Sequence, residues 1–261
     1  MDLLILISFI LSVLLGVGRG IDLAFFTDAE TGLCTAGSVW LRYAALAAAV
    51  GVAVLAGRSR ATEPDALRGQ CKPSGITALA TAVCFGLAGI FRILWMHSSI
   101  LMLVRAVLEL LCAFWLLCLG RSWLQKEWKA PTRSLTPAVL GNLIFYWCVL
   151  ARFMENSSSW HRVAPTAMVW QLLAGLVFLS TLLRAIYLPG TASGRTLCAS
   201  ALASFALCLC WELPTVVQMA VENGAAVLMA PAVWFRLGLC CVGVLGGLCA
   251  ARCFLAGGQD A

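Results

Sequence analysis

The sequence predicts an all-α, polytopic integral membrane bundle of about eight transmembrane helices, and three observations support this fold class. Of its 261 residues, 62% are hydrophobic and only 11% are charged, whereas a soluble domain needs roughly a quarter of its residues charged. The mean hydropathy is +0.94. Apolar segments long enough to cross a bilayer recur along the chain. We therefore expect a single transmembrane domain, residues 1–261, with the lipid bilayer as its solvent and no soluble domain.

Eight apolar segments account for the predicted spans, and each approaches or exceeds the ~20 residues that cross a ~30 Å hydrocarbon core. They cover residues 3–24, 39–57, 76–95, 100–120, 137–154, 168–188, 197–219 and 225–251. The first has neither a basic n-region nor an A-x-A cleavage site, so it predicts a helix rather than a signal peptide. Pro214 and Pro231 interrupt the last two spans and predict kinks there, since neighbouring helices can satisfy the freed carbonyls.

The loop charges predict the orientation of the spans. Loops 58–75 and 121–134, together with Arg184, Arg195 and Arg252, hold 11 of the 18 basic residues, including every lysine. The loops on the opposite side hold a single arginine, so the positive-inside rule places both termini in the cytoplasm. We expect the plasma membrane of a prokaryotic cell. The formal charge of +6 is spread over membrane loops and predicts no nucleic-acid partner.

Two smaller patterns concern helix contacts and the membrane interface. Gly16-x-x-x-Gly20 and Gly243-x-x-x-Gly247 predict close approaches between helices. Trp123 and Trp128, in a loop that also carries lysines, predict an interfacial anchor against anionic lipid.

A repeat of helical hairpins is one interpretation of the spacing of tryptophan and arginine. The Val-Trp pairs at Trp40, Trp170 and Trp234 begin even-numbered spans and are separated by 130 and 64 residues, a period near 65 with one copy skipped. Three arginines in the same phase are Arg42, Arg105 and Arg236. Four tandem hairpins of one orientation explain this spacing. Chance is the alternative, because Arg and Trp concentrate at membrane interfaces anyway.

Charged residues inside the spans are the candidate functional residues. In the stretch 91–121, Glu109 follows Arg105 by four residues, so the two share a helix face and suit an ion pair. A charge in lipid costs a few kcal/mol, so this face is expected to point into the bundle. The full set of candidate ligand-binding residues is Arg19, Arg42, Arg92, Arg105, Glu109, Arg152, Glu212 and Arg236.

Two interpretations of this set stay open. In the first, the arginines extend to outer headgroups, or pair with Asp22, Glu109 and Glu212 and lock the bundle. In the second, they line an outward-facing cavity for an anion or a carboxylate-bearing molecule, because the arginine fork binds carboxylate or phosphate bidentately. Glu212, two residues before Pro214, fits the interrupted helices that line transporter sites.

Catalysis and cofactors have little support in the sequence. The 13 cysteines form no CxxC pair, and the two histidines, His97 and His161, lie in predicted outer loops, so no metal site is expected. No HExxH, GxSxG or glycine-rich phosphate loop is present, and no histidine lies within a span. We expect no catalytic residues, no cofactor and no enzymatic activity.

Three classes of function remain. A small-molecule transporter-like protein, with an anion as its ligand, agrees best with the arginine set and with the prolines at 214 and 231, which favour moving helices. The alternative is a membrane sensor or an accessory subunit that binds a partner membrane subunit. A membrane-embedded enzyme comes third.

Overall fold

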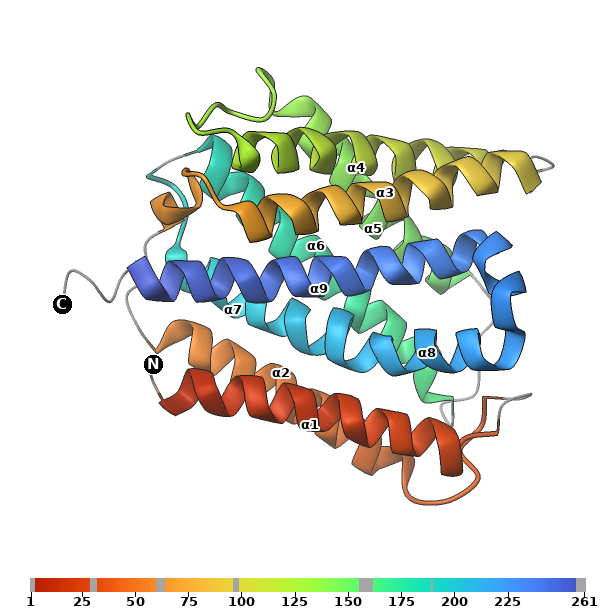
Figure 1. Ribbon diagram of the computed structural model, residues 1–261. Helices are drawn as coiled ribbons and strands as arrows, with labels where there is room; N and C mark the ends of the chain where they lie inside the picture. The colour runs from red at the N-terminus through yellow and green to blue at the C-terminus, as the bar shows by residue number, and fades with distance from the viewer. Residues whose placement is uncertain are drawn as a thin grey trace.

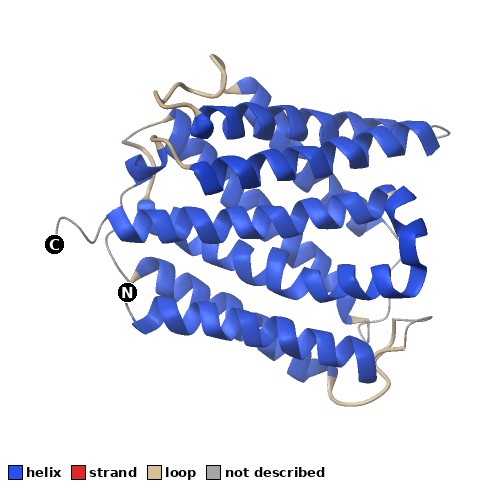
Figure 2. Cartoon of the chain, in the orientation of Figure 1, coloured by secondary structure: helices blue, strands red, loops and turns tan. Residues whose placement is uncertain are grey.

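The computed structural model describes residues 3–28, 32–59, 64–95, 99–154, 162–188 and 190–256, and in these ranges the chain is a bundle of helices (Figure 1; Figure 2). Within the same ranges, eight helical segments are long and apolar enough to cross a membrane. The predicted fold class, an all-α polytopic bundle, is confirmed. His97, His161 and Arg60 lie outside the described residues.

Consecutive spans run in opposite directions, and most of them pack against the span before them (Figure 1). The first six are α1 (Leu3–Phe25), α2 (Val39–Arg58), α3 (Lys72–Trp95), α4 (Ile100–Leu124), α5 (Thr136–Met154) and α6 (Val163–Tyr187). The seventh span consists of α7 (Gly194–Ser204), a π-helix η2 (Phe205–Trp211) and α8 (Glu212–Asn223), and the eighth is α9 (Pro231–Ala256). Two short 3₁₀ helices, η1 (Pro64–Leu67) and η3 (Gly224–Met229), lie in connections. The exception to the packing of consecutive spans is the step from α2 to α3: α2 packs against α1 and α7, whereas α3 packs against α4 and α9.

The bundle has two ends, which differ in the residues that they carry. The "terminus end" is where α1 begins and α9 ends, at the left of Figure 1. The "turn end" is where α1 leads to α2, α3 to α4, α5 to α6 and α8 to α9. The described parts of the basic loops, 58–59 and 64–75 together with 121–134, lie at the terminus end, and the predicted ligand-binding arginines lie at the turn end.

One of the two proline predictions is wrong. Pro214 lies in a helix that continues through it, as expected, but Pro231 begins α9 instead of kinking the predicted span 225–251. Proline suits the first helical position because the N–H that it lacks would have no intrahelical partner there. Pro73, Pro137 and Pro165 also lie in first turns, at the starts of α3, α5 and α6.

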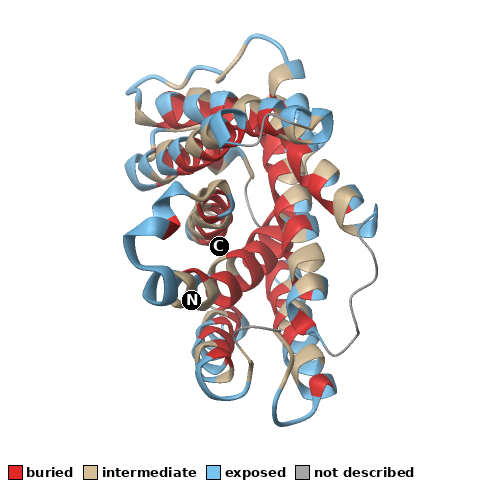
Figure 3. Cartoon of the chain, turned by 90° about the vertical axis from the view of Figure 1, so that its right-hand side faces the viewer, coloured by how far each residue is buried: buried red, intermediate tan, exposed pale blue. Residues whose placement is uncertain are grey.

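The seventh and eighth spans are the most deeply buried and form the centre of the core. In the apolar part of the seventh span 78% of the residues are buried, against 28% for α1 and for α2. Buried residues gather on the inward faces of the helices, while exposed residues cover the outside (Figure 3). The two N-terminal spans therefore have the smallest buried share of the eight and present most of their surface to lipid.

Both glycine motifs pack against the seventh span, which confirms the expected close contacts. A Cβ on Gly16 of α1 would lie 2.7 Å from the Cys210 carbonyl oxygen, and one on Gly243 of α9 would lie 2.5 Å from the Leu209 backbone nitrogen. Pro214 has no N–H to give the Cys210 carbonyl four residues earlier. The glycine of α1 thus leaves room for the Cys210 carbonyl, to which Pro214 cannot donate.

The expectation of an aromatic anchor is wrong for Trp123. Its ring is fully buried, and its indole N–H donates to the Leu67 carbonyl at 2.8 Å. Nearby, the Arg68 side chain donates to the carbonyls of Ala185 and Ile186, at 3.2 and 2.9 Å, and so caps the last turn of α6. The loops at the terminus end are therefore folded onto the bundle.

Candidate functional site

Seven of the eight predicted site residues lie at the turn end in three ion-paired groups. Each group is named after its carboxylate: the Asp22 group, the Glu109 group and the Glu212 group. The members are Asp22 with Arg19 and Arg42, Glu109 with Arg92 and Arg105, and Glu212 with Arg236 and Gln171. The eighth residue, Arg152 near the end of α5, is not a member of these groups.

The Asp22 group joins α1 to α2. Asp22 follows Arg19 by about one turn of α1, and Arg19 Nη1 lies 2.7 Å from Asp22 Oδ2. Arg42 of α2 donates to the other oxygen of the same carboxylate, through Nε at 2.8 Å and through Nη2. Arg42 is further fixed by the carbonyls of Ala36 and Phe26, at 3.1 and 3.3 Å. One carboxylate therefore serves two guanidinium groups, and one positive charge is left in excess.

The Glu109 group joins α3 to α4 in the same way. Arg92 of α3 makes a bidentate contact with Glu109, with Nε to Oε2 at 3.1 Å and Nη2 to Oε1 at 2.9 Å. Arg105 adds the predicted bond along α4, Nε to Oε1 at 3.1 Å. Glu109 is fully buried and Arg92 is 4% exposed. The predicted pair exists, but the stronger partner of Glu109 is an arginine on the neighbouring helix.

The Glu212 group joins the seventh span to α6 and α9. Arg236 of α9 pairs with Glu212 Oε1, and Gln171 of α6 donates to Oε2 at 2.7 Å. The same Gln171 amide donates to the Leu207 carbonyl in the π-helix at 3.2 Å. In return, the Cys208 thiol donates to the Gln171 carbonyl at 3.3 Å. This group is charge-balanced, and it fastens the π-helix to α6.

Aromatic rings connect the three groups. The Arg19 guanidinium lies over Trp211, 4.7 Å from the ring centroid, and Arg105 lies over Phe235 at 4.9 Å. Trp211 directly precedes Glu212, and Phe235 directly precedes Arg236. Such cation–π contacts are worth about 2 kcal/mol when desolvated. A belt of alternating charges and rings therefore runs across the turn end from α2 to α3.

The sequence interpretation missed three members of this belt. Gln171, Trp211 and Phe235 all lie inside apolar spans. Trp211 and Phe235 gave no signal there, because aromatic residues are common in such spans. Gln171 did offer a signal, because an amide within an apolar span has to find a partner in the bundle.

Two cavities adjoin the Asp22 group. The "α1–α2 groove", about 550 Å³, has mostly apolar walls that include Leu14 and Leu41. The "turn-end hollow", about 180 Å³, lies between the end of α1, the following connection and α8, where Glu222 lines it. Arg19 contributes to the wall of both cavities.

Arg19 is the least satisfied of the charged side chains in the groups. It is only 5% exposed, and its Nε is buried without a hydrogen-bond partner. A buried donor without a partner costs about 1–3 kcal/mol, more for a charged group. Arg19 thus offers an unused donor and part of an unbalanced positive charge to whatever enters the adjoining cavities.

The fold and these groups define the chain as a polytopic α-helical membrane protein with ion pairs inside the bundle. Over the described ranges, no cluster of three or more His, Cys, Asp and Glu side chains is arranged to hold a metal ion. Comparison with protein-family models, curated proteins and solved structures finds no match.

Proposed function

We propose that the protein is a transporter-like membrane protein for a small anionic amphiphile, a molecule with a carboxylate or phosphate group and an apolar tail. The observation that carries the proposal is Arg19, buried between the turn-end hollow and the apolar α1–α2 groove with its Nε unpaired. The anionic group of the ligand binds Arg19, and the tail lies in the α1–α2 groove. The groove is built from lipid-facing helices, so an apolar tail can enter from the bilayer.

The arrangement of the Asp22 group would allow an incoming anion to replace Asp22 as the partner of Arg19. Arg19 holds Asp22 through one nitrogen, whereas Arg42 is fixed by the carboxylate and two carbonyls. An incoming anion therefore competes with Asp22 for Arg19 while Arg42 keeps Asp22 in place. The excess positive charge of the group favours this occupant. Movement of the lightly buried α1 relative to α2 then opens the groove.

The test uses the full chain in nanodiscs of zwitterionic lipid, with octyl phosphate and inorganic phosphate as probes. Octyl phosphate at about 100 times its Kd is expected to stabilise the protein by roughly 2.7 kcal/mol, seen as a rise in melting temperature. Arg19→Gln should abolish this rise. Arg162→Gln, which removes an exposed arginine at the same end, should leave it unchanged. If inorganic phosphate stabilises as well as octyl phosphate, the groove has no part in binding.

Transport itself is measured as uptake of labelled octyl phosphate into proteoliposomes. We expect uptake by the wild type and by Arg162→Gln, and background uptake by Arg19→Gln. Binding without uptake would exclude a transporter and support the second candidate, a sensor or an accessory subunit of a membrane complex. That candidate is favoured by the belt that connects Arg19 through Trp211 to Glu212 and hence to α6 and α9.

The proposed function also requires the protein to lie in a particular membrane with a particular orientation. The basic residues at the terminus end favour a cytoplasmic location for both termini, in the plasma membrane of a prokaryotic cell. The hollow beside Arg19 then faces the outside. The proposed function contains no catalytic step.

A further inference from the structure

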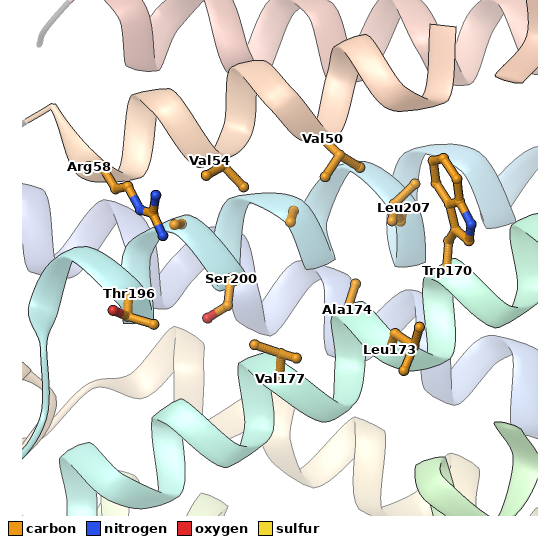
Figure 4. A pocket seen from close by; sticks show the side chains of 12 residues that line it. Val50, Val54, Arg58, Trp170, Leu173, Ala174, Val177, Thr196, Ser200 and Leu207 are labelled. Carbon is orange, nitrogen blue, oxygen red and sulfur yellow. The ribbon is translucent and has the colours of Figure 1, made fainter. Parts of the chain in front are cut away.

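A second apolar slot lies on the other side of α2, between α2, α6 and α7 (Figure 4). Its volume is about 420 Å³, and its walls include Val50 and Val54 of α2, Leu173 and Val177 of α6, and Ala203 in α7. Leu173 and Val177 are 43% and 47% exposed, so the slot opens onto the lipid-facing surface. Apolar molecules in the bilayer therefore have direct access to it.

The slot has one charged end. Arg58, the last residue of α2, and Thr196 lie at the terminus end of the slot, and Trp170 and Leu207 lie at its other end (Figure 4). Arg58 is exposed and makes no hydrogen bond or ion pair with any residue in the described part of the chain. From residue 58 back to residue 50, an α-helix rises roughly 12 Å. That length is close to the ~15 Å thickness of the hydrocarbon in one leaflet.

We propose that this slot binds one acyl chain of an anionic phospholipid from the leaflet at the terminus end, with the lipid phosphate at Arg58. The apolar walls, the length and the single unpaired guanidinium at headgroup level match the two parts of such a lipid. The hydroxyl of Thr196 adds a neutral donor beside the phosphate. The site is separate from the α1–α2 groove and does not depend on the proposed function.

A helix from another chain does not fit the slot. The walls cannot spread easily at this point, because α2 and α7 touch: a Cβ on Gly57 would lie 2.3 Å from the backbone of Ala199. A narrow, flexible chain is therefore the better occupant.

The experiment is native mass spectrometry of the detergent-solubilised full chain, titrated with phosphatidylglycerol or phosphatidylcholine of identical acyl chains. One basic residue near an anionic headgroup contributes about 1 kcal/mol, which is about a fivefold preference. We expect the wild type to bind one phosphatidylglycerol about fivefold more tightly than phosphatidylcholine. Arg58→Gln should remove the preference, whereas Arg133→Gln, an exposed arginine at the same end outside the slot, should retain it.

A second set of variants tests the proposal by filling the slot with a larger side chain. Ala174→Phe places a ring in the slot and should abolish retention of the bound phosphatidylglycerol. If that variant does not fold, Val177→Trp fills the slot from a more exposed position. Equal retention of the two lipids by the wild type, or undiminished phosphatidylglycerol binding by a filled variant, overturns the proposal. A dimer that the filled variants dissociate also overturns it, because the occupant is then a second copy of the chain.

Discussion

At the scale of single residues, the turn end is organised by three carboxylates. Asp22 and Glu109 each form ion pairs with two arginines, and Glu212 pairs with one arginine and accepts a hydrogen bond from the Gln171 amide. Two of these groups therefore carry excess positive charge inside the bundle, which is costly unless the carboxylate stays in place. Removing a carboxylate should accordingly harm the protein more than removing an arginine.

Glu109→Gln is expected to destabilise the protein strongly, because it leaves Arg92 and Arg105 facing each other without their shared carboxylate. Breaking a buried pair costs about 3–5 kcal/mol, and water defects in the membrane reduce this cost. The melting temperature in detergent should fall clearly. Glu222→Gln, which changes an exposed acid, should melt close to the wild type.

Double variants distinguish how much each of the two arginines contributes to the loss of stability. Adding Arg92→Gln to Glu109→Gln should restore more stability than adding Arg105→Gln, because the Arg92 side chain is 5% exposed and that of Arg105 is 24% exposed. The more exposed arginine can turn toward water when its partner is lost. Equal restoration by both would show that the two arginines share the burial cost equally.

At the scale of elements, the seventh span is the part that deviates from regular helix and also the part most surrounded by others. Its π-helix is approached by a glycine of α1 on one side and a glycine of α9 on another. The amide of Gln171 holds its Leu207 carbonyl. π-helical turns are found frequently at functional sites, and here the turn leads directly to Glu212 and its ion pair.

Gly16→Ala is expected to destabilise the bundle, because its added methyl would lie 2.7 Å from the backbone oxygen of Cys210. Overpacking against backbone costs about 1–3 kcal/mol. Gly18→Ala on the same helix has nothing within 4 Å of its added methyl and is the matched control. Thermal melts of both variants provide the comparison. A Gly16→Ala protein as stable as Gly18→Ala would mean that α1 does not pack on the π-helix as described.

Gln171→Leu should also destabilise the protein, because it leaves the Leu207 carbonyl and one oxygen of Glu212 without their donor. The expected cost is about 1–3 kcal/mol. Gln218→Leu is the control, since Gln218 bonds only on the exposed side of α8, to Glu222. The measurement is again a melting curve. Similar melting of the two variants would contradict the role given to Gln171.

At the scale of the whole molecule, the two ends of the bundle differ in their chemistry. The terminus end carries the basic loops, and Arg68 and Trp123 fold part of them onto the helices. The turn end carries the three ion-paired groups. The hairpin repeat remains a prediction, although Arg42 and Arg236, which belong to the same phase, both bind a carboxylate on the preceding span.

The orientation can be tested with an impermeant maleimide on intact cells. Cys34 at the turn end should label from outside, and Cys71, at the terminus end, should not. Because the Cys71 thiol is half-buried and bonded to Ser74, Ser134→Cys is a more accessible reporter for the terminus end. It should label only after the cells are opened. Labelling of both ends from the same side would refute the eight-span topology.

Much of the architecture could be predicted from the sequence because hydropathy and helical spacing are local properties of the chain. Seven of the predicted spans agree with the observed helices in place, and the eighth is displaced by Pro231, whose position at a helix start is also a local preference. The Arg105–Glu109 pair was predictable for the same reason, since residues four apart share a helix face.

By itself the sequence determined the class of protein, the eight spans and the end of the bundle at which the charged residues gather. The tertiary structure decided which charges meet. Arg42 pairs with Asp22, Arg92 with Glu109 and Arg236 with Glu212, and in each pair the two residues lie on different helices. It also decided that Trp123 is buried and that Arg19 lies between two cavities. These outcomes depend on how far each helix is rotated and shifted against its neighbours, which side-chain packing sets and local sequence does not encode.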